Sequence, residues 1–250
     1  MKTTMLNETD LIFPDWPAPG NVKAVQTTRN GGFSKGAYAS FNLGSHVGDD
    51  PLIVAANRQL LSPIVPTEPV WLSQVHGTQV INAATANCAP TADAAFAASH
   101  NTVCAVMTAD CLPILLCDQS GTVVAAVHAG WRGLLNGVIE ASVQAMQKLP
   151  GELMAWLGPA IGPTAFEVGD EVRDAFLAHG QATQQAFVRH GESKWLADIY
   201  QLARMRLQKS GIESICGGNL CTYSDANSFY SYRRDGITGR MATLVWLTEK

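Results

Sequence analysis

Three short apolar runs in the middle of the chain constrain the fold most. They cover residues 103–107, 112–117 and 122–127, and each has the aliphatic and β-branched content typical of buried strands. The sequence Asp118-Gln119-Ser120-Gly121 between the last two runs is typical of a tight turn. We therefore expect buried strands here, with the second and third joined as an antiparallel hairpin.

Helical and strand-like segments alternate around this centre. A helix is predicted after Gly133, because apolar residues recur at helical spacing up to Pro150. The glycine-rich stretch 27–48 suits an ordered functional loop. The sequence therefore favours an α+β class with mixed β-sheets. The other predicted elements are helices at 51–61 (capped by Asp50), 170–179 (ending at Gly180) and about 198–210 (stopping at Gly211), with strands at 153–157 and 240–247.

The composition bounds the class of protein. With 250 residues, 47% of them hydrophobic and 15% charged, the chain can bury a large core. We interpret residues 1–250 as one domain, because the proline-dotted stretch 63–69 is only a weak boundary. A net charge of -4 without a basic run argues against nucleic acid and anionic membrane surfaces as partners. Small molecules or protein partners are favoured instead.

The termini and the cysteines predict a cytoplasmic protein. Residues 1–15 lack the apolar stretch of a secretory signal, and no apolar run reaches membrane-spanning length. A chain of this length without a signal argues against disulfides. The six cysteines contain no C-x-x-C pair, so most are expected to be small buried hydrophobic residues.

The predicted hairpin brings a cysteine and a histidine together. With Asp118 paired to Gly121, Cys111 lies directly opposite His128. Opposed side chains on one sheet face have their Cβ atoms about 4.5–5.5 Å apart, which suits two ligands of one metal ion. Shifting the turn by one residue places Cys111 opposite Gly130 and leaves His128 one diagonal away, still within reach.

A thiolate beside an imidazole favours zinc or copper. His76 is the predicted third ligand, because it follows the apolar run 70–72 at a point where site residues often cluster. Three protein ligands leave a fourth position open, as in catalytic sites. Two other interpretations remain: Cys111 and His128 are packing residues, or Cys111 is a nucleophile that His128 activates without a metal.

Several other residues have no decisive pattern. Asp110 fits a turn residue or a group that polarises a ligand, and Trp131 fits a packing anchor. The segment 232–236 is either a solvated loop or a source of arginines that bind an anion. Surface or local hydrogen-bonding roles are expected for the histidines without a companion motif: His46, His100, His179 and His190.

Seven motifs, in order along nearly the whole chain, resemble one family. They are TTRNGGFSKGAYASFNLGSHVGDD (27–50), NR (57–58), QVHG (74–77), TADCLPILL (108–116), HAGWRG (128–133), GPAIGP (158–163) and YRRDGITGRMA (232–242). The family is the bacterial YfiH family, also called multicopper polyphenol oxidase, laccase-domain protein or purine nucleoside phosphorylase. After Ala92-Asp93-Ala94 the chain departs from its pattern with Ala95-Phe96-Ala97, so no detailed role is assigned to that segment.

The resemblance implies a fold and an activity. It implies a CNF/YfiH-like fold of cysteine-hydrolase type, with β-sheets between helices, and a catalytic zinc held by His76, Cys111 and His128. The implied reactions are phosphorolysis of adenosine, inosine, guanosine and methylthioadenosine, and hydrolytic deamination of adenosine. The oligomeric state stays open.

The expected partners are therefore a nucleoside and phosphate. Phosphorolysis builds positive charge on the ribosyl carbon while an anion attacks, so cationic donors are expected near the metal. Arg29, Arg58 and Arg233 are the predicted donors. Ser40 and Asn42, in the glycine-rich loop, are predicted to bind ribose hydroxyls.

Three rival functions follow from the same residues. A copper-dependent polyphenol oxidase fits poorly, because multicopper sites need about ten histidines and this chain has six. The second rival, a non-catalytic zinc-binding protein, is disfavoured because structural zinc normally has four protein ligands and the sequence suggests three. A Cys-His amide hydrolase acting on cell-wall precursors uses Cys111 as the nucleophile.

Overall fold

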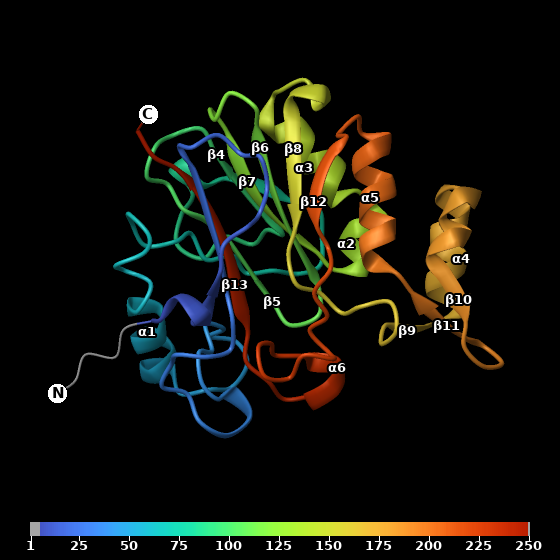
Figure 1. The fold of residues 1–250 in the computed structure, drawn as a ribbon, viewed down its shortest axis with the longest axis horizontal. Helices are drawn as coiled ribbons and strands as arrows, with labels where there is room; N and C mark the ends of the chain where they lie inside the picture. Colours follow the sequence, from blue (N-terminus) through green and yellow to red (C-terminus); the bar gives the residue numbers. More distant parts are fainter. Residues whose placement is uncertain (1–5, 250) are drawn as a thin grey trace.

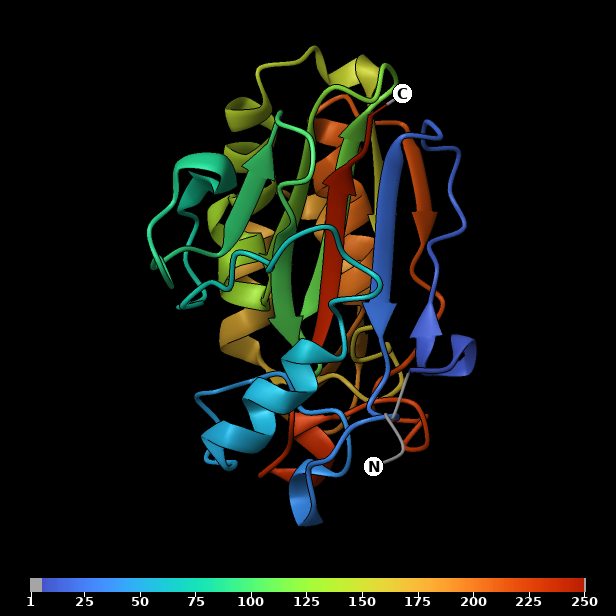
Figure 2. The same cartoon turned by 90° about the vertical axis from the view of Figure 1, so that its left-hand side faces the viewer.

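Two β-sheets packed face to face form the centre of the molecule. The computed structural model describes residues 6–249. Helices cover the outer face of the larger sheet, and the segment 41–65 covers the outer face of the smaller one (Figures 1 and 2). This arrangement confirms the prediction of an α+β fold with mixed sheets between helices.

The larger sheet has six strands in the order β12-β8-β6-β7-β4-β3. The pairs β12–β8 and β3–β4 are parallel and the other pairs are antiparallel. Its central strands are buried along their whole length because both faces are covered. The strands are β3 (Val80–Asn82), β4 (Ala94–Ala97), β6 (Leu112–Asp118), β7 (Val124–Ala129), β8 (Leu153–Leu157) and β12 (Ser214–Gly217).

The smaller sheet has four antiparallel strands in the order β1-β2-β13-β5. Side chains alternate between its faces, as strand geometry requires. Cys104 and Val106 pack between the sheets, whereas Ala105 and Met107 pack beneath the segment 41–65. The strands are β1 (Leu11–Ile12), β2 (Val22–Thr27), β5 (Cys104–Thr108) and β13 (Met241–Leu247).

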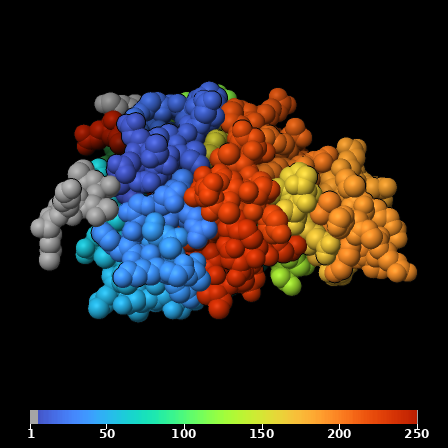
Figure 3. Space-filling view, turned by 60° about the horizontal axis from the view of Figure 1, so that its bottom comes forward, coloured from blue at the N-terminus to red at the C-terminus, as the bar shows by residue number. Residues whose placement is uncertain are grey.

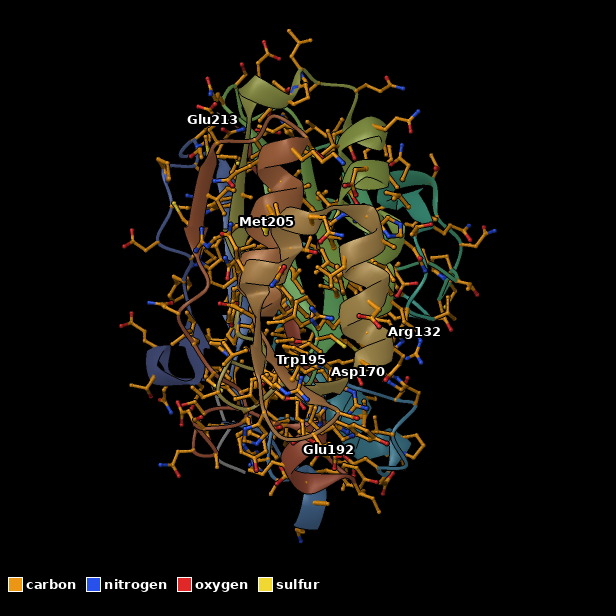
Figure 4. The ribbon with its side chains drawn as sticks, turned by 90° about the vertical axis from the view of Figure 1, so that its right-hand side faces the viewer. Arg132, Asp170, Glu192, Trp195, Met205 and Glu213 are labelled. Atoms are coloured by element: carbon orange, nitrogen blue, oxygen red, sulfur yellow. The ribbon has the colours of Figure 1, made fainter. Side chains whose placement is uncertain are left out.

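The remaining elements surround these layers. Helices α2, α3 and α5 pack on the larger sheet, and α4 packs on a small third sheet of order β10-β11-β9 (Figures 1 and 4). The helices are α1 (Pro51–Gln59), α2 (Trp131–Asn136), α3 (Val138–Met146), α4 (Asp170–His179), α5 (Ile199–Lys209) and α6 (Tyr232–Asp235). The small strands are β9 (Glu167–Gly169), β10 (Phe187–Arg189) and β11 (Lys194–Ala197). Short 3₁₀ helices cover Glu8–Asp10, Gly36–Tyr38, Ala83–Thr85, Pro150–Glu152 and Gln181–Ala186.

Most predicted helices and strands are confirmed, but the helix predicted after Gly133 is two helices. It breaks at Gly137, whose φ of 101° lies in the left-handed region that an α-helix cannot contain. The apolar spacing continues across the break because α2 and α3 both pack on the larger sheet. Apolar periodicity therefore identified the buried face and missed the interruption.

The predicted hairpin is present, but its first register is wrong. Cys117 pairs with Val124 and Pro113 pairs with His128, which is the shifted register. The cause is Asp118, whose carboxylate accepts hydrogen bonds from the Thr122 backbone N–H (2.6 Å) and hydroxyl (2.6 Å) and from the Val123 N–H (3.0 Å). These bonds extend the turn to include Thr122. Cys111 therefore lies opposite Gly130, and His128 is its diagonal neighbour.

Candidate metal centre

His76, Cys111 and His128 meet at one end of the larger sheet. His128 is near the end of β7, Cys111 immediately precedes β6, and His76 lies in the loop before β3. Their ligand atoms all lie within 4.8 Å of one another. The Cys111 Sγ is 3.6 Å from the His76 Nε2, and the two imidazole centroids are 4.8 Å apart. The predicted three-residue cluster is thus formed.

Gly130 permits this close approach. A Cβ atom at Gly130 would lie 2.7 Å from the His76 Cδ2 and 3.2 Å from the Cys111 Sγ. Any larger residue would therefore displace both ligands. Cys111 is itself held by its neighbour Asp110, whose carboxylate accepts hydrogen bonds from the Thr222 hydroxyl (2.6 Å) and the Arg233 N–H (2.7 Å). Asp110 is thus a structural anchor rather than a ligand.

Asp93 organises both histidines. Its buried Oδ1 accepts hydrogen bonds from the His128 Nδ1 (2.8 Å) and from the backbone N–H of His76 (2.8 Å). Its Oδ2 accepts a bond of 2.6 Å from the Gly77 N–H. The bond to Nδ1 leaves the Nε2 of His128 free to bind a metal, which is the common second-shell arrangement for histidine ligands. Sequence reasoning missed Asp93, because nothing in the local pattern marks it.

The glutamine of the QVHG motif ties the loop of His76 to the smaller sheet. The Gln74 side-chain amide donates to the carbonyl of Met107 and accepts from its N–H, both at 2.8 Å. These two bonds take the place of the backbone hydrogen bonds that a neighbouring strand would make at the end of β5. His76 itself has a φ of 61°. The loop is therefore held on both sides of the ligand, by Gln74 and by Asp93.

The donor set fits zinc. Two imidazole nitrogens and one thiolate at normal zinc distances in tetrahedral geometry lie about 3.3–3.8 Å from one another. The 3.6 Å between the Cys111 Sγ and the His76 Nε2 matches this spacing, and the three ligand atoms together lie within the wider limit of 4.8 Å. The described residues contain one such group of three potential ligands and supply no fourth, as expected of a catalytic rather than a structural site.

Cys111 is poised to be a thiolate. Burial opposes its ionisation, but the charge of His128 and hydrogen bonds from His128 and His76 outweigh burial and lower its pKa to about 6. Burial likewise opposes the charge of His128, while Cys111 and Asp93 raise its pKa to about 9. Metal binding by cysteine requires the thiolate, so these neighbours prepare the ligand.

This pKa predicts that Cys111 of the metal-free protein is alkylated at neutral pH, whereas the buried Cys117 is not. Because only the thiolate reacts, we expect the alkylation rate of Cys111 to rise through about pH 6 and to level off by pH 7. Cys117 should stay unmodified, since burial and the charge of Asp118 raise its pKa to about 12. Peptide mass spectrometry after brief iodoacetamide treatment measures both. Zinc should protect Cys111, and an unreactive Cys111 in metal-free protein at pH 7 would contradict the expectation.

Two cavities adjoin the cluster and share His76, Cys111 and Tyr232. The first, of about 250 Å³, is mostly apolar and aromatic, with Arg132 and Arg233 among its lining residues. The second, of about 370 Å³, has more polar side chains in its lining, and we call it the polar cavity. The apolar cavity is lined by Trp131, Ile161, Phe166 and Ile199, and the polar cavity by His46, Gln74, Thr108 and Arg240.

Arg233 is the one predicted substrate-binding residue that lines either cavity. Its Nη1 donates to the carbonyl of Glu167 at 2.8 Å. Arg58 stacks on Trp71 and donates to the carbonyl of Leu43 through Nε and Nη2 (3.0 and 2.8 Å). The structure therefore gives Arg58 a bracing role beside the site.

The other predicted residues hold the glycine-rich loop together. Arg29 donates to the carbonyls of Ala39 and Ala226, which joins this loop to the segment 220–240 (Figure 3). The Ser40 hydroxyl bonds to the carbonyl of Arg29 at 3.0 Å. The Asn42 amide donates twice and accepts twice within the protein, so its hydrogen-bonding capacity is used. These contacts are structural and leave the predicted ribose contacts without support.

Comparison with known proteins agrees with these features. Residues 23–248 match the family described as multi-copper polyphenol oxidoreductase laccase. The protein named purine nucleoside phosphorylase YfiH of Escherichia coli strain K12 is 53% identical over 240 residues, which cover 95% of this chain and 98% of that protein. The chain belongs to the YfiH family.

Further relatives and solved structures extend this assignment. A protein of Pseudomonas aeruginosa named as a purine nucleoside phosphorylase is 52% identical over 239 residues, covering 95% of this chain and 98% of its own length. A Neisseria meningitidis protein of family DUF152 superposes on this YfiH-family chain with a TM-score of 0.95 at 51% identity, covering 96% and 100% of the two chains. YlmD from Geobacillus stearothermophilus superposes with a TM-score of 0.84 at 30% identity, covering 93% and 94%. The YfiH-like fold is thereby confirmed.

A helix that crosses a membrane must be both long and apolar. Among residues 6–249, none of the helices combines the length and the apolar character needed to cross a bilayer.

Proposed function

We propose that this YfiH-family chain is a zinc-dependent purine nucleoside phosphorylase. The observation that carries the proposal is a three-ligand centre, with no fourth protein ligand, between an apolar aromatic cavity and a polar one. Relatives more than 50% identical bear the name purine nucleoside phosphorylase. The proposed substrates are adenosine, inosine, guanosine and methylthioadenosine.

The aromatic cavity suits the purine. Flat heteroaromatic ligands favour apolar cavities with a few polar groups that set their orientation. Trp131, Phe166 and Tyr232 supply aromatic surface, while Arg132 and Arg233 supply donors for purine nitrogen or oxygen atoms. A purine seated there would place its ribose near His76 and Cys111, which both cavities share.

His76, Cys111 and His128 would hold a zinc ion, which when bound would supply Lewis-acid chemistry and an activated water. The chain's own residues do the rest. Asp93 keeps the proton of His128 on Nδ1, so that the Nε2 stays a ligand. The apolar wall excludes water around the base, which strengthens polar contacts to the ribose. Hydrolytic deamination of adenosine is the second proposed reaction, because the same site can activate water.

Product analysis tests this function. We expect zinc-loaded protein incubated with inosine and phosphate to release hypoxanthine and ribose 1-phosphate, with no base released when phosphate is omitted. Adenosine should yield adenine when phosphate is present, and it should also yield inosine by deamination. Chromatography of the bases and enzymatic assay of the sugar phosphate measure both reactions. If no incubation released a free base, and adenosine gave no inosine, the proposal would be refuted.

Copper-dependent oxidation of polyphenols is the second candidate, because the matching family is described as a laccase. Two histidines and a cysteine also form the ligand set of blue-copper sites. The described residues hold a single three-ligand group, whereas multicopper chemistry needs several copper sites. Stoichiometric copper in purified protein, with oxygen consumed in the presence of a phenol, would favour this candidate.

The Cys-His amide hydrolase is the third candidate. Asp93, His128 and Cys111 follow one another in the manner of an acid-base-nucleophile triad, and the pKa of Cys111 is low. The position of His76 against the Cys111 Sγ favours metal binding instead. Trapping of a cell-wall peptide as a thioester on Cys111 in metal-free protein would support the hydrolase.

A further inference from the structure

The polar cavity beside the metal centre has the chemistry of an anion site. Its lining contains Arg240 and three histidines, and no carboxylate. His76 and His128 belong to the metal cluster, so Arg240 and His46 are the basic groups left for a ligand. A volume of about 370 Å³ also exceeds what one phosphate ion needs. The cavity can therefore hold a phosphate together with part of a ribose.

Arg240 is held rigidly at this cavity. Its backbone N–H donates to the Asn42 Oδ1 at 2.9 Å, and its carbonyl accepts from the Leu43 N–H at 3.1 Å. Its Nη1 donates to the carbonyls of Thr238 and Gly239 (3.0 and 2.9 Å). The Nε and Nη2 have no hydrogen-bond partner within residues 6–249. A planar guanidinium fixed on one side and free on the other suits an oxyanion.

Two further polar groups of this cavity lack partners. His46 is exposed, and its imidazole makes no hydrogen bond to any described residue, so it is open to a ligand. Thr108, which also lines the cavity, is buried, and its hydroxyl has no partner in the described part of the chain. Buried hydroxyl groups almost always have a partner. An unpartnered hydroxyl beside a free guanidinium is evidence that something polar completes the site.

Arg240 brings a positive charge to the cavity, next to the thiol of Cys111 in the same lining. Partial burial lowers the pKa of His46, and the charges of Arg240 and Arg58 lower it further. Burial also lowers the pKa of Arg240, although Cys111 and Asp110 act in the opposite direction. Arg58 therefore contributes to the field without lining the cavity. Desolvated positive charge of this kind is stabilised by a bound anion.

We propose that Arg240 and His46, with the hydroxyl of Thr108, bind the phosphate that attacks the nucleoside. The assignment rests on the proposed phosphorolysis and names its second substrate site. This assignment replaces Arg29 and Arg58, which donate to backbone carbonyls and do not line the cavity. The two substrates then approach the centre from its two cavities, the nucleoside on the aromatic side and the phosphate on the basic side.

This placement fits the chemistry of the step. A phosphate oxygen forms a bond to C1′ of the ribose while the bond from C1′ to the purine N9 breaks. The bonding electron pair leaves with the purine, which takes up the proton that hydrogen phosphate carried. The products are the free base and ribose 1-phosphate. Arg240 would hold the anion so that one of its oxygens faces C1′.

Arg240→Gln tests the assignment. Titration calorimetry of inorganic phosphate into zinc-loaded protein should show binding to the wild type and about 10- to 100-fold weaker binding to the variant, the usual effect of losing bonds to a charged group. The KM for phosphate should rise similarly, while the KM for inosine changes little. His46→Gln should also weaken phosphate binding. This variant stays informative if Arg240→Gln does not fold, because the ring of His46 makes no hydrogen bond to any described residue.

Arg132→Gln is the matched control, since this arginine lines the aromatic cavity (Figure 4) and its removal deletes the same charge. It should leave phosphate affinity unchanged. Wild-type phosphate affinity in both Arg240→Gln and His46→Gln, or no phosphate binding by the wild type, would overturn the assignment. If phosphate-dependent base release occurs while both variants keep the wild-type KM for phosphate, the phosphorylase function stands and this site is wrong. If phosphate binds and Arg240→Gln weakens it, but no base is released, the anion site stands and the proposed function fails.

Discussion

Cys111→Ser is expected to remove the bound zinc and to lower kcat/KM for inosine phosphorolysis by a factor on the order of 10³, about 4 kcal/mol of transition-state stabilisation. Serine keeps the size of the side chain but has no thiolate at neutral pH. The centre then has only His76 and His128, and two neutral imidazoles bind zinc weakly. Elemental analysis of the purified variant, together with steady-state kinetics, measures both effects.

Cys88→Ser is the control for this change. Cys88 is exposed and takes no part in the metal centre or its cavities. The control should therefore keep wild-type zinc content and activity, which excludes a general effect of removing a thiol. Stoichiometric zinc and full phosphorolysis in Cys111→Ser would show that the metal is bound elsewhere, and the proposed centre would have to be abandoned.

Asp93→Asn should weaken zinc binding about 10- to 100-fold, the usual effect of losing a second-shell partner. It should also lower the free energy of unfolding by about 3–5 kcal/mol, the cost of breaking a buried charged pair. The carboxylate accepts hydrogen bonds from His128, His76 and Gly77. An asparagine has one acceptor oxygen, so its amide group would face an N–H donor. Competition with a zinc chelator and denaturant titration measure the two effects.

Asp118→Asn separates the two effects. Asp118 is also buried and accepts hydrogen bonds from backbone N–H groups, but it lies at the far end of the same hairpin. This variant should lose stability and keep wild-type zinc affinity. If Asp93→Asn lost stability but bound zinc as tightly as Asp118→Asn, Asp93 would be a structural residue with no influence on the metal.

The ionisation of Asp93 makes its contribution to the stability of the fold depend on pH. Burial raises its pKa, but hydrogen bonds from His128 and Gly77 outweigh burial and hold the pKa below the ordinary value. A carboxyl group with a depressed pKa stabilises the fold above its unfolded-state pKa and loses this effect as the pH falls. The stability difference between the wild type and Asp93→Asn should therefore shrink in acid.

Local patterns predicted most of the regular elements. Asp50 with Pro51 marked the start of α1, and the residues before Gly180 and Gly211 marked the ends of α4 and α5. Such signals were readable because a cap or a glycine that ends a helix acts within a few residues of itself. Short strands such as β4 and β9 were missed, since their pairing partners, rather than their own residues, make them strands.

Some residues of the candidate site could be predicted from local patterns and others could not. The tight turn indicated that Cys111 and His128 lie on one sheet face, although the hydrogen bonds of Asp118 moved the register. His76 was a candidate from its place after the apolar run 70–72, and only the resemblance joined it to the other two, because no spacing argument reaches across 35 residues. His46 and Arg240 had no pattern, since their segments meet only in the folded chain.

The sequence by itself determined the strand and helix segments, the ligand types and the family, because apolar periodicity, turn residues and motifs are local properties of the chain. Only the tertiary structure decided that Asp93 orients both histidines and that Arg240 and His46 share a cavity with the metal centre. These relations depend on how distant segments pack and on which hydrogen bonds remain unused after packing. The three candidate ligands could be named from the chain, whereas the groups that surround and position them became visible only in the fold.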